Sequence, residues 1–138
     1  MAADVFVDTS GFYACLVRRD DQHERAAELL RSAEGRRRFM TTDYVLDETV
    51  TLLKMRSQDH LIESFLSITL SSPSCGIEWM DAGRFETAKT FLLQHGDHAY
   101  SFTDCFSFCV MSQFGLRDAL TKDAHFQEAG FNPLLVHA

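Results

Sequence analysis

The chain has 138 residues, of which 46% are hydrophobic and 24% charged, as in an ordinary globular protein. This length supports one domain, 1–138, with a core of its own, and the composition excludes a disordered chain, a collagen and a disulfide-stapled miniprotein. Thirteen basic and 20 acidic residues leave a net charge of −7, which excludes a uniformly basic surface for nucleic acid.

The first half of the chain begins with a predicted strand over Val5–Val7, and the polar run 8–11 after it has the composition of a turn. Apolar residues at helical spacing predict a helix over 23–34, which Gly35 ends. A second strand is predicted over 38–41. A helix capped by Thr42 or Asp43 then runs to about Arg56.

The second half continues the alternation of strands and helices. Helices are predicted over 59–70, 81–95 and 102–114, and strands over 77–80, 119–121 and 134–136. Such alternation is typical of an α/β domain whose parallel sheet is covered by helices on both faces.

Acidic residues follow the predicted strands at one edge of this sheet. Asp8 ends the first strand and Asp123 follows the fourth, while Glu48 lies early in the helix after the second strand. The helix 102–114 leads back into the fourth strand, so its first turn, with Asp104, belongs to the same edge. Because ligands of parallel sheets bind outside the carboxyl ends of the strands, we expect these four acids to converge there.

Each acid also has a purely structural interpretation. Asp8 can form a turn, Asp104 can cap its helix, and Asp123 can cap a turn at 124–126. Asp104 is, however, the only charged residue of a helix that is apolar almost all round, and a buried carboxylate needs a partner or a metal. Asp47 and Glu48 lie about 100° apart on a helix, so only one of them can face the site.

The residue types at this edge favour a hard divalent cation. Mg²⁺ binds carboxylates, water and substrate phosphate, and it can activate water for phosphodiester hydrolysis. No phosphate-binding loop, serine nucleophile motif or zinc-type histidine pair occurs.

Among the six histidines, His125 lies closest to this edge and is interpreted as a surface or capping residue. Cys105 and Cys109 share a helix face and are interpreted as core thiols.

Other features concern the compartment and the charge distribution. The four cysteines form no CxxC pair, and no secretory signal or membrane-spanning stretch is found, so we expect a cytoplasmic protein without membrane contact.

Residues 17–38 hold seven arginines against five acids, while the rest of the chain is strongly acidic. This segment is either a phosphate-binding surface or a solvated, salt-bridged helix face.

Four stretches together resemble the motifs of the PIN domain family, in order and across essentially the whole chain. They are Val5-Phe6-Val7-Asp8-Thr9-Ser10, Thr41 to Glu48, Ser101-Phe102-Thr103-Asp104-Cys105, and Leu120 to Phe126. The resemblance implies a five-stranded parallel sheet in the order 3-2-1-4-5 and an endoribonuclease that depends on Mg²⁺ or Mn²⁺. A single-domain member of this size is similar to the VapC toxins, which implies an RNA substrate, a VapB-type antitoxin and a homodimer.

The resemblance assigns roles to individual residues. Asp8, Glu48, Asp104 and Asp123 become the acidic metal-binding and catalytic quartet, and Thr9 and Thr121 fall where hydroxyls support it. His125 stands where many toxins carry a further acid. The alternative functions are a non-catalytic PIN module that binds RNA or protein, and a small phosphatase or receiver-like domain that uses Asp8 as phosphoryl acceptor.

Overall fold

The computed structural model describes residues 3–33 and 37–136, and its centre is a sheet of parallel strands. The strands are β1 (Val5–Val7), β2 (Phe39–Thr42), β3 (Cys75–Glu78), β4 (Asp118–Leu120) and β5 (Asn132–Pro133). They pair in the order β3-β2-β1-β4-β5, with every pairing parallel. The predicted α/β class and strand order are therefore confirmed.

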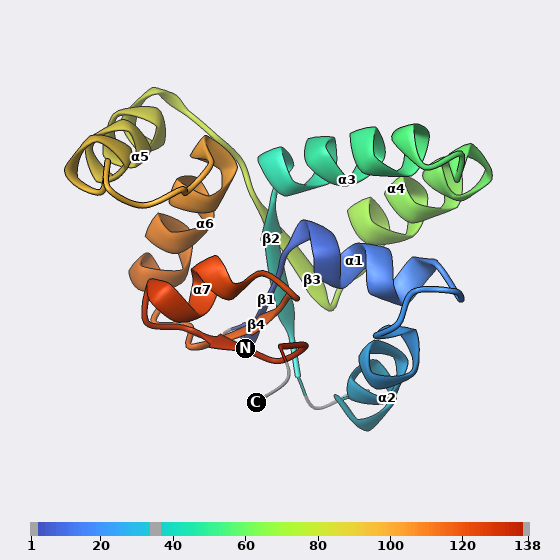
Figure 1. Ribbon diagram of the computed structural model, residues 1–138. Helices are drawn as coiled ribbons and strands as arrows, with labels where there is room; N and C mark the ends of the chain where they lie inside the picture. Colours follow the sequence, from blue (N-terminus) through green and yellow to red (C-terminus); the bar gives the residue numbers. More distant parts are fainter. Residues whose placement is uncertain (1–2, 34–36, 137–138) are drawn as a thin grey trace.

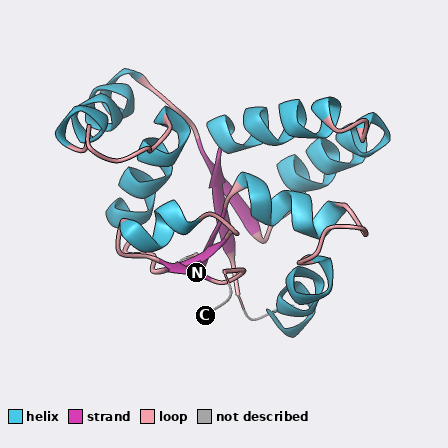
Figure 2. Cartoon of the chain, in the orientation of Figure 1, coloured by secondary structure: helices cyan, strands magenta, loops and turns pink. Residues whose placement is uncertain are grey.

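Two layers of helices cover this sheet (Figure 1). The helices are α1 (Thr9–Leu16), α2 (His23–Ala33), α3 (Asp43–Met55), α4 (Ile62–Ser71), α5 (Ala82–Gln94), α6 (Phe102–Gln113) and α7 (Ala124–Glu128), with a 3₁₀ turn, η1, at Asp59–Leu61. Helices α1 to α4 lie on one face and α5 to α7 on the other, with the strands between them (Figure 2). None of the helices in the described residues is long and apolar enough to cross a membrane.

Alternation along β1 joins the two layers into one core. Phe6 is completely buried in the cluster that contains Phe106 and Phe126, on the side of α6 and α7. Val5 and Val7 belong to the opposite cluster, which includes Ala14 of α1. Because successive side chains of a strand point to opposite faces, three residues anchor both layers and hold the end of β1 in place.

The predicted turn at 8–11 is wrong, because the chain enters α1 directly after Asp8. Gly11 gave the turn signal, yet it lies inside the helix for a packing reason. A Cβ atom at this position would overlap the carbonyl oxygen of Leu120 and lie 2.8 Å from its carbonyl carbon. The glycine therefore lets α1 pack directly against the end of β4.

Other element boundaries differ from those predicted. The segment 124–126 belongs to a short helix rather than a turn, and the last strand is 132–133 instead of 134–136. The third strand begins two residues earlier than predicted, at Cys75. Helix α2 ends at Ala33 in the structure, and the predicted stop at Gly35 lies outside the described residues.

Helix α6 is the central buried helix that its apolar sequence predicts. Seven of its residues are buried: Asp104, Cys105, Phe106, Ser107, Phe108, Val110 and Met111. Cys105 is a buried free thiol and Cys109 a half-buried one, which fits their interpretation as core thiols. The helix points its N-terminus to the carboxyl edge of the sheet, and this places Asp104 there.

Candidate active site

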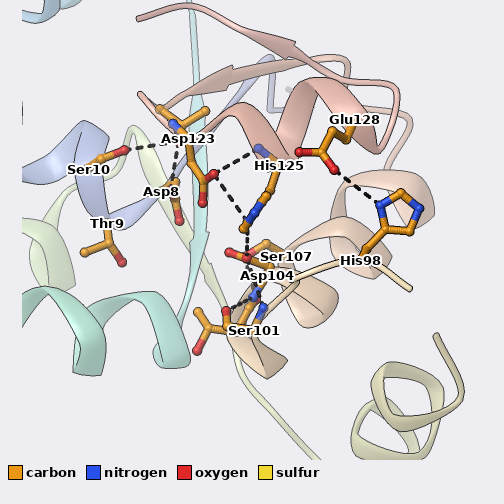
Figure 3. A network of polar contacts seen from close by, with 12 residues as sticks. Asp8, Thr9, Ser10, His98, Ser101, Asp104, Ser107, Asp123, His125 and Glu128 are labelled. Carbon is orange, nitrogen blue, oxygen red and sulfur yellow. Dashed lines mark hydrogen bonds and ion pairs between the residues drawn. The ribbon is translucent and has the colours of Figure 1, made fainter. Parts of the chain in front are cut away.

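Four acidic side chains from four helices lie at the carboxyl edge of the sheet. Asp8 occupies the N-cap position of α1, Glu48 lies in the second turn of α3, Asp104 in the first turn of α6, and Asp123 at the N-cap of α7. Figure 3 shows Asp8, Asp104 and Asp123 around one space, with His125 beside them. The structure thus brings together residues that are more than one hundred positions apart in the sequence.

Asp8 is the most deeply buried of these acids, with 4% of its surface exposed. Its Oδ2 accepts a hydrogen bond of 2.9 Å from Thr121 Oγ1. Burial raises the pKa of Asp8 to about 7, and the negative charges of Asp104 and Glu48 act in the same direction, against the hydrogen bonds from Thr121 and the Thr9 backbone. Without a cation, the fold therefore holds this carboxylate at an energetic cost.

Helix α3 presents Glu48 to the site and Asp47 to solvent. Thr9 Oγ1 donates a hydrogen bond of 2.6 Å to Glu48 Oε1, and Asp47 is exposed. The choice between the two neighbouring acids, which the sequence left open, is made by this contact. Thr9 is itself buried, so this hydrogen bond restrains the orientation of the Glu48 carboxylate.

Hydroxyl groups join the first turn of α1 to the segment that follows β4. Thr121 Oγ1, which holds Asp8, also accepts the backbone N–H of Asp123 at 3.0 Å and lies 3.1 Å from Ser10 Oγ. Ser10 Oγ accepts the backbone N–H of Lys122 at 2.8 Å. Sequence reasoning missed this role of Ser10, because only the helical course of 9–16 turns its side chain toward β4.

Asp104 is both a helix cap and a member of the acidic group. It forms a capping box with Ser101: its backbone N–H donates to Ser101 Oγ at 3.0 Å, and its Oδ2 accepts the Ser101 N–H at 3.1 Å. The side chain is only 9% exposed. Burial raises the pKa of Asp104, and the charge of Asp123 raises it further, despite the opposing effect of the Ser101 hydrogen bond and of His125.

Asp123 and His125 complete the group from α7. Asp123 Oδ1 accepts the backbone N–H of His125 at 2.9 Å. The imidazole Nδ1 lies 3.2 Å from Asp104 Oδ2 and 3.4 Å from Asp123 Oδ1. Burial alone would lower the pKa of His125, but the hydrogen bond to Asp104 and the charges of Asp123, Asp104 and Glu128 raise it overall. His125 therefore contacts two of the predicted acids, and its side chain stays 29% exposed.

This donor set fits a divalent cation. One ligand atom from each of Asp104, Asp123 and His125 lies within 4.8 Å of the other two, and two of these side chains are only partly buried. Carboxylate oxygens and imidazole nitrogens are common ligands of divalent metals. A positive charge here would also offset the burial, and the smaller charge repulsion, that raise the pKa values of Asp8 and Asp104.

The described arginines of the segment 17–38 do not all lie beside the acids. Arg37 pairs with Asp118 at 2.9 Å and Arg38 donates to the Pro73 carbonyl, both at the amino end of the sheet. Arg18 and Arg19, after α1, are exposed. Arg36 lies outside the described residues.

Comparisons with known proteins show the family and the fold that this chain shares. The PIN domain family matches residues 5–132. The 23S rRNA-specific endonuclease VapC20 of Mycobacterium tuberculosis is 35% identical over 127 residues, which cover 92% of this chain and 95% of that protein. Its crystal structure, described as that of a sarcin-ricin loop-cleaving toxin, superposes with a TM-score of 0.83 at 34% identity and covers 93% of this chain and 96% of that one.

More distant structures share the fold alone. PAE2754 from Pyrobaculum aerophilum superposes with a TM-score of 0.67 at 16% identity, covering 97% of this chain and 91% of that one. VapBC2 from Rickettsia felis, bound to a DNA fragment from its promoter, superposes with a TM-score of 0.61 at 18% identity, covering 96% and 95%.

Proposed function

This chain belongs to the PIN domain family, and we propose that it is a metal-dependent endoribonuclease of the VapC toxin type. The observation that carries the proposal is that Asp8 interacts electrostatically with Glu48 and Asp104, and Asp104 with Asp123, at one edge of the sheet. A non-catalytic PIN module would not need buried carboxylates at Asp8 and Asp104, because burial raises the pKa of each and ionising them in the fold costs stability.

We propose Mg²⁺ or Mn²⁺ as the cofactor, held by Asp8, Asp104 and Asp123, with Glu48 as a further ligand or as the group that orients the attacking water. When bound, such a cation activates water and stabilises the leaving oxygen of a phosphodiester. The products expected from this chemistry are a 5′-phosphate and a 3′-hydroxyl.

The remaining polar residues hold these acids in position. Thr121 keeps the Asp8 carboxylate facing the site, and Thr9 does the same for Glu48. Ser101 fixes Asp104 through the capping box. A displacement of a catalytic group by about 1 Å can lower the reaction rate about 100-fold. These contacts restrain the acids, so they limit such a displacement when the phosphate binds.

We propose RNA, and ribosomal RNA in the first place, as the substrate, because 23S rRNA is the substrate in the printed name of the similar VapC20. With such a substrate, we expect the activity in the cytoplasm. An antitoxin partner is proposed from the same relationship. An apolar cavity of about 200 Å³ beside α1, α2 and α4, lined in part by Leu16, Leu30 and Ile68, supports a protein partner on that face. The homodimer implied by the family stays a prediction.

The test is cleavage of 23S rRNA by the purified protein with Mg²⁺ or Mn²⁺, followed by mapping of the new RNA ends. We expect cleavage that EDTA stops and that Asp104→Asn reduces at least 100-fold, about the loss that follows removal of one essential electrostatic group. Asp97→Asn, at a side chain that is 83% exposed, is the matched control. Equal cleavage by Asp104→Asn and wild type would refute the assignment, and RNA binding without cleavage would favour the non-catalytic module.

A further inference from the structure

The side chain that distinguishes this site from a purely acidic one is His125. Its Nδ1 faces two carboxylates at once, at 3.2 Å from Asp104 and 3.4 Å from Asp123. We propose that His125 is a direct metal ligand and that its nitrogen makes the site bind Mn²⁺ in preference to Mg²⁺. The inference rests on the proposed metal-dependent function and specifies which cation that function uses.

The imidazole is held in this orientation from behind. The ring of Tyr100 packs against that of His125 edge-to-face, with 5.5 Å between the centroids. Tyr100 is buried and is covered by His98, which stacks on it at 4.7 Å and is anchored by Glu128 at 3.2 Å. The backbone N–H of His125 is bound by Asp123, so the main chain and the ring are both fixed toward the acids.

The chemistry of the donors decides the metal. Mg²⁺ strongly prefers oxygen ligands and gives up its waters reluctantly, whereas imidazole nitrogen suits the transition metals better. With Asp104 and Asp123, His125 supplies two oxygens and one nitrogen within 4.8 Å. A site with an acid at position 125 would offer oxygen alone, so the histidine favours Mn²⁺ over Mg²⁺.

A different role for His125 would leave a different signature. A histidine that only hydrogen-bonds Asp104 can be replaced by asparagine without a change of metal preference, because asparagine also donates to a carboxylate. A ligand cannot be replaced in this way, since its ring nitrogen is lost. The comparison of His125→Asn and His125→Asp with wild type therefore separates the two roles.

The experiment measures binding of MnCl₂ and MgCl₂ by calorimetry, and the electron spin echo modulation of bound Mn²⁺. Wild type should show the modulation of a coordinated imidazole nitrogen, and both variants should lose it. The ratio of Mn²⁺ to Mg²⁺ affinity should fall at least about tenfold in His125→Asp, because even outer-shell partners change metal affinity by about 10- to 100-fold. His60→Asn, which removes an exposed imidazole in η1 outside the donor group and its supporting rings, should keep both properties.

The wild-type spectrum decides the matter even if a variant does not fold. Absence of nitrogen modulation in wild type, or an unchanged affinity ratio in folded His125→Asp, would overturn the inference. In that case, continued RNA cleavage that EDTA stops would leave the proposed nuclease function standing. A wild-type protein that binds neither cation and cleaves no RNA would refute both.

Discussion

Replacing Asp8 with asparagine should stabilise the metal-free protein at alkaline pH, although it removes a residue proposed to be essential. Burial raises the pKa of Asp8 from an ordinary value of 3.8 to about 7. Each pKa unit corresponds to about 1.4 kcal/mol, so ionised Asp8 costs the folded state about 4 kcal/mol. This is a large part of the about 5–15 kcal/mol by which small proteins are stable.

The sign of the effect follows from linkage. A carboxyl group with a raised folded-state pKa costs no stability below pH 3.8, costs progressively more between 3.8 and 7, and reaches its full cost above 7. Asparagine is neutral throughout, and its side-chain oxygen can still accept the hydrogen bond from Thr121. The gain from Asp8→Asn should therefore be near zero at pH 4 and approach about 4 kcal/mol at pH 8.

Urea denaturation in EDTA at pH 4, 6 and 8 measures this difference in the free energy of unfolding. Mg²⁺ or Mn²⁺ should stabilise wild type, by about 2.7 kcal/mol at a hundredfold excess over Kd, and should stabilise Asp8→Asn less. Asp97→Asn controls for the loss of one exposed negative charge. Parallel pH profiles for Asp8→Asn and wild type would show that Asp8 carries no such cost, and the reasoning from burial would be refuted.

Three further substitutions test the surroundings of the site. Thr121→Val removes the hydrogen-bond donor to Asp8, so it should raise the pKa of Asp8 further and lower kcat about tenfold or more. Thr121→Ser keeps the hydroxyl and should keep most of the activity. The pH–rate profiles of wild type and the two variants measure the difference. Gly11→Ala should destabilise the protein by about 3 kcal/mol or more, because its Cβ would overlap the Leu120 carbonyl. Thermal melts measure the effect, with Gly76→Ala as the control because the nearest atom to a Cβ there is 4.0 Å away. Arg37→Ala should lower the free energy of unfolding by less than about 1 kcal/mol, because Arg37 forms a partly exposed ion pair with Asp118. It should also leave the salt dependence of RNA binding unchanged, because this pair lies at the amino end of the sheet, away from the acids. A change in the slope of log affinity against log salt concentration would show that RNA contacts Arg37.

Much of the site could be predicted from the sequence because of one property of parallel sheets. Every strand of such a sheet ends at the same edge, so an acid placed after a strand is located once the strand is recognised. Asp8 and Asp123 were located in this way, and the apolar sequence of 102–114 identified the central helix that carries Asp104. The order of the strands came from resemblance to the PIN domain, since alternation alone does not determine it.

Local sequence failed where a residue serves a distant contact. Gly11 is of a residue type that is common in turns, yet it lies inside α1. Glycine is needed there because Leu120 of β4 packs directly against the helix backbone. Ser10 and Thr121, 111 positions apart, meet only in the folded chain. Secondary-structure propensity reflects a residue and its neighbours in the chain, whereas the roles of Gly11, Ser10 and Thr121 are determined by neighbours in space.

Tertiary structure also made the choices that the pattern left open. The hydrogen bond from Thr9 selects Glu48 over Asp47, and the turn into α7 directs His125 toward Asp104. The sequence by itself determined the fold class and the acids at the carboxyl edge, because strand ends and residue types are local properties. Only the packed helices decided which donor atoms face one another, because that depends on side-chain directions set by contacts between different elements.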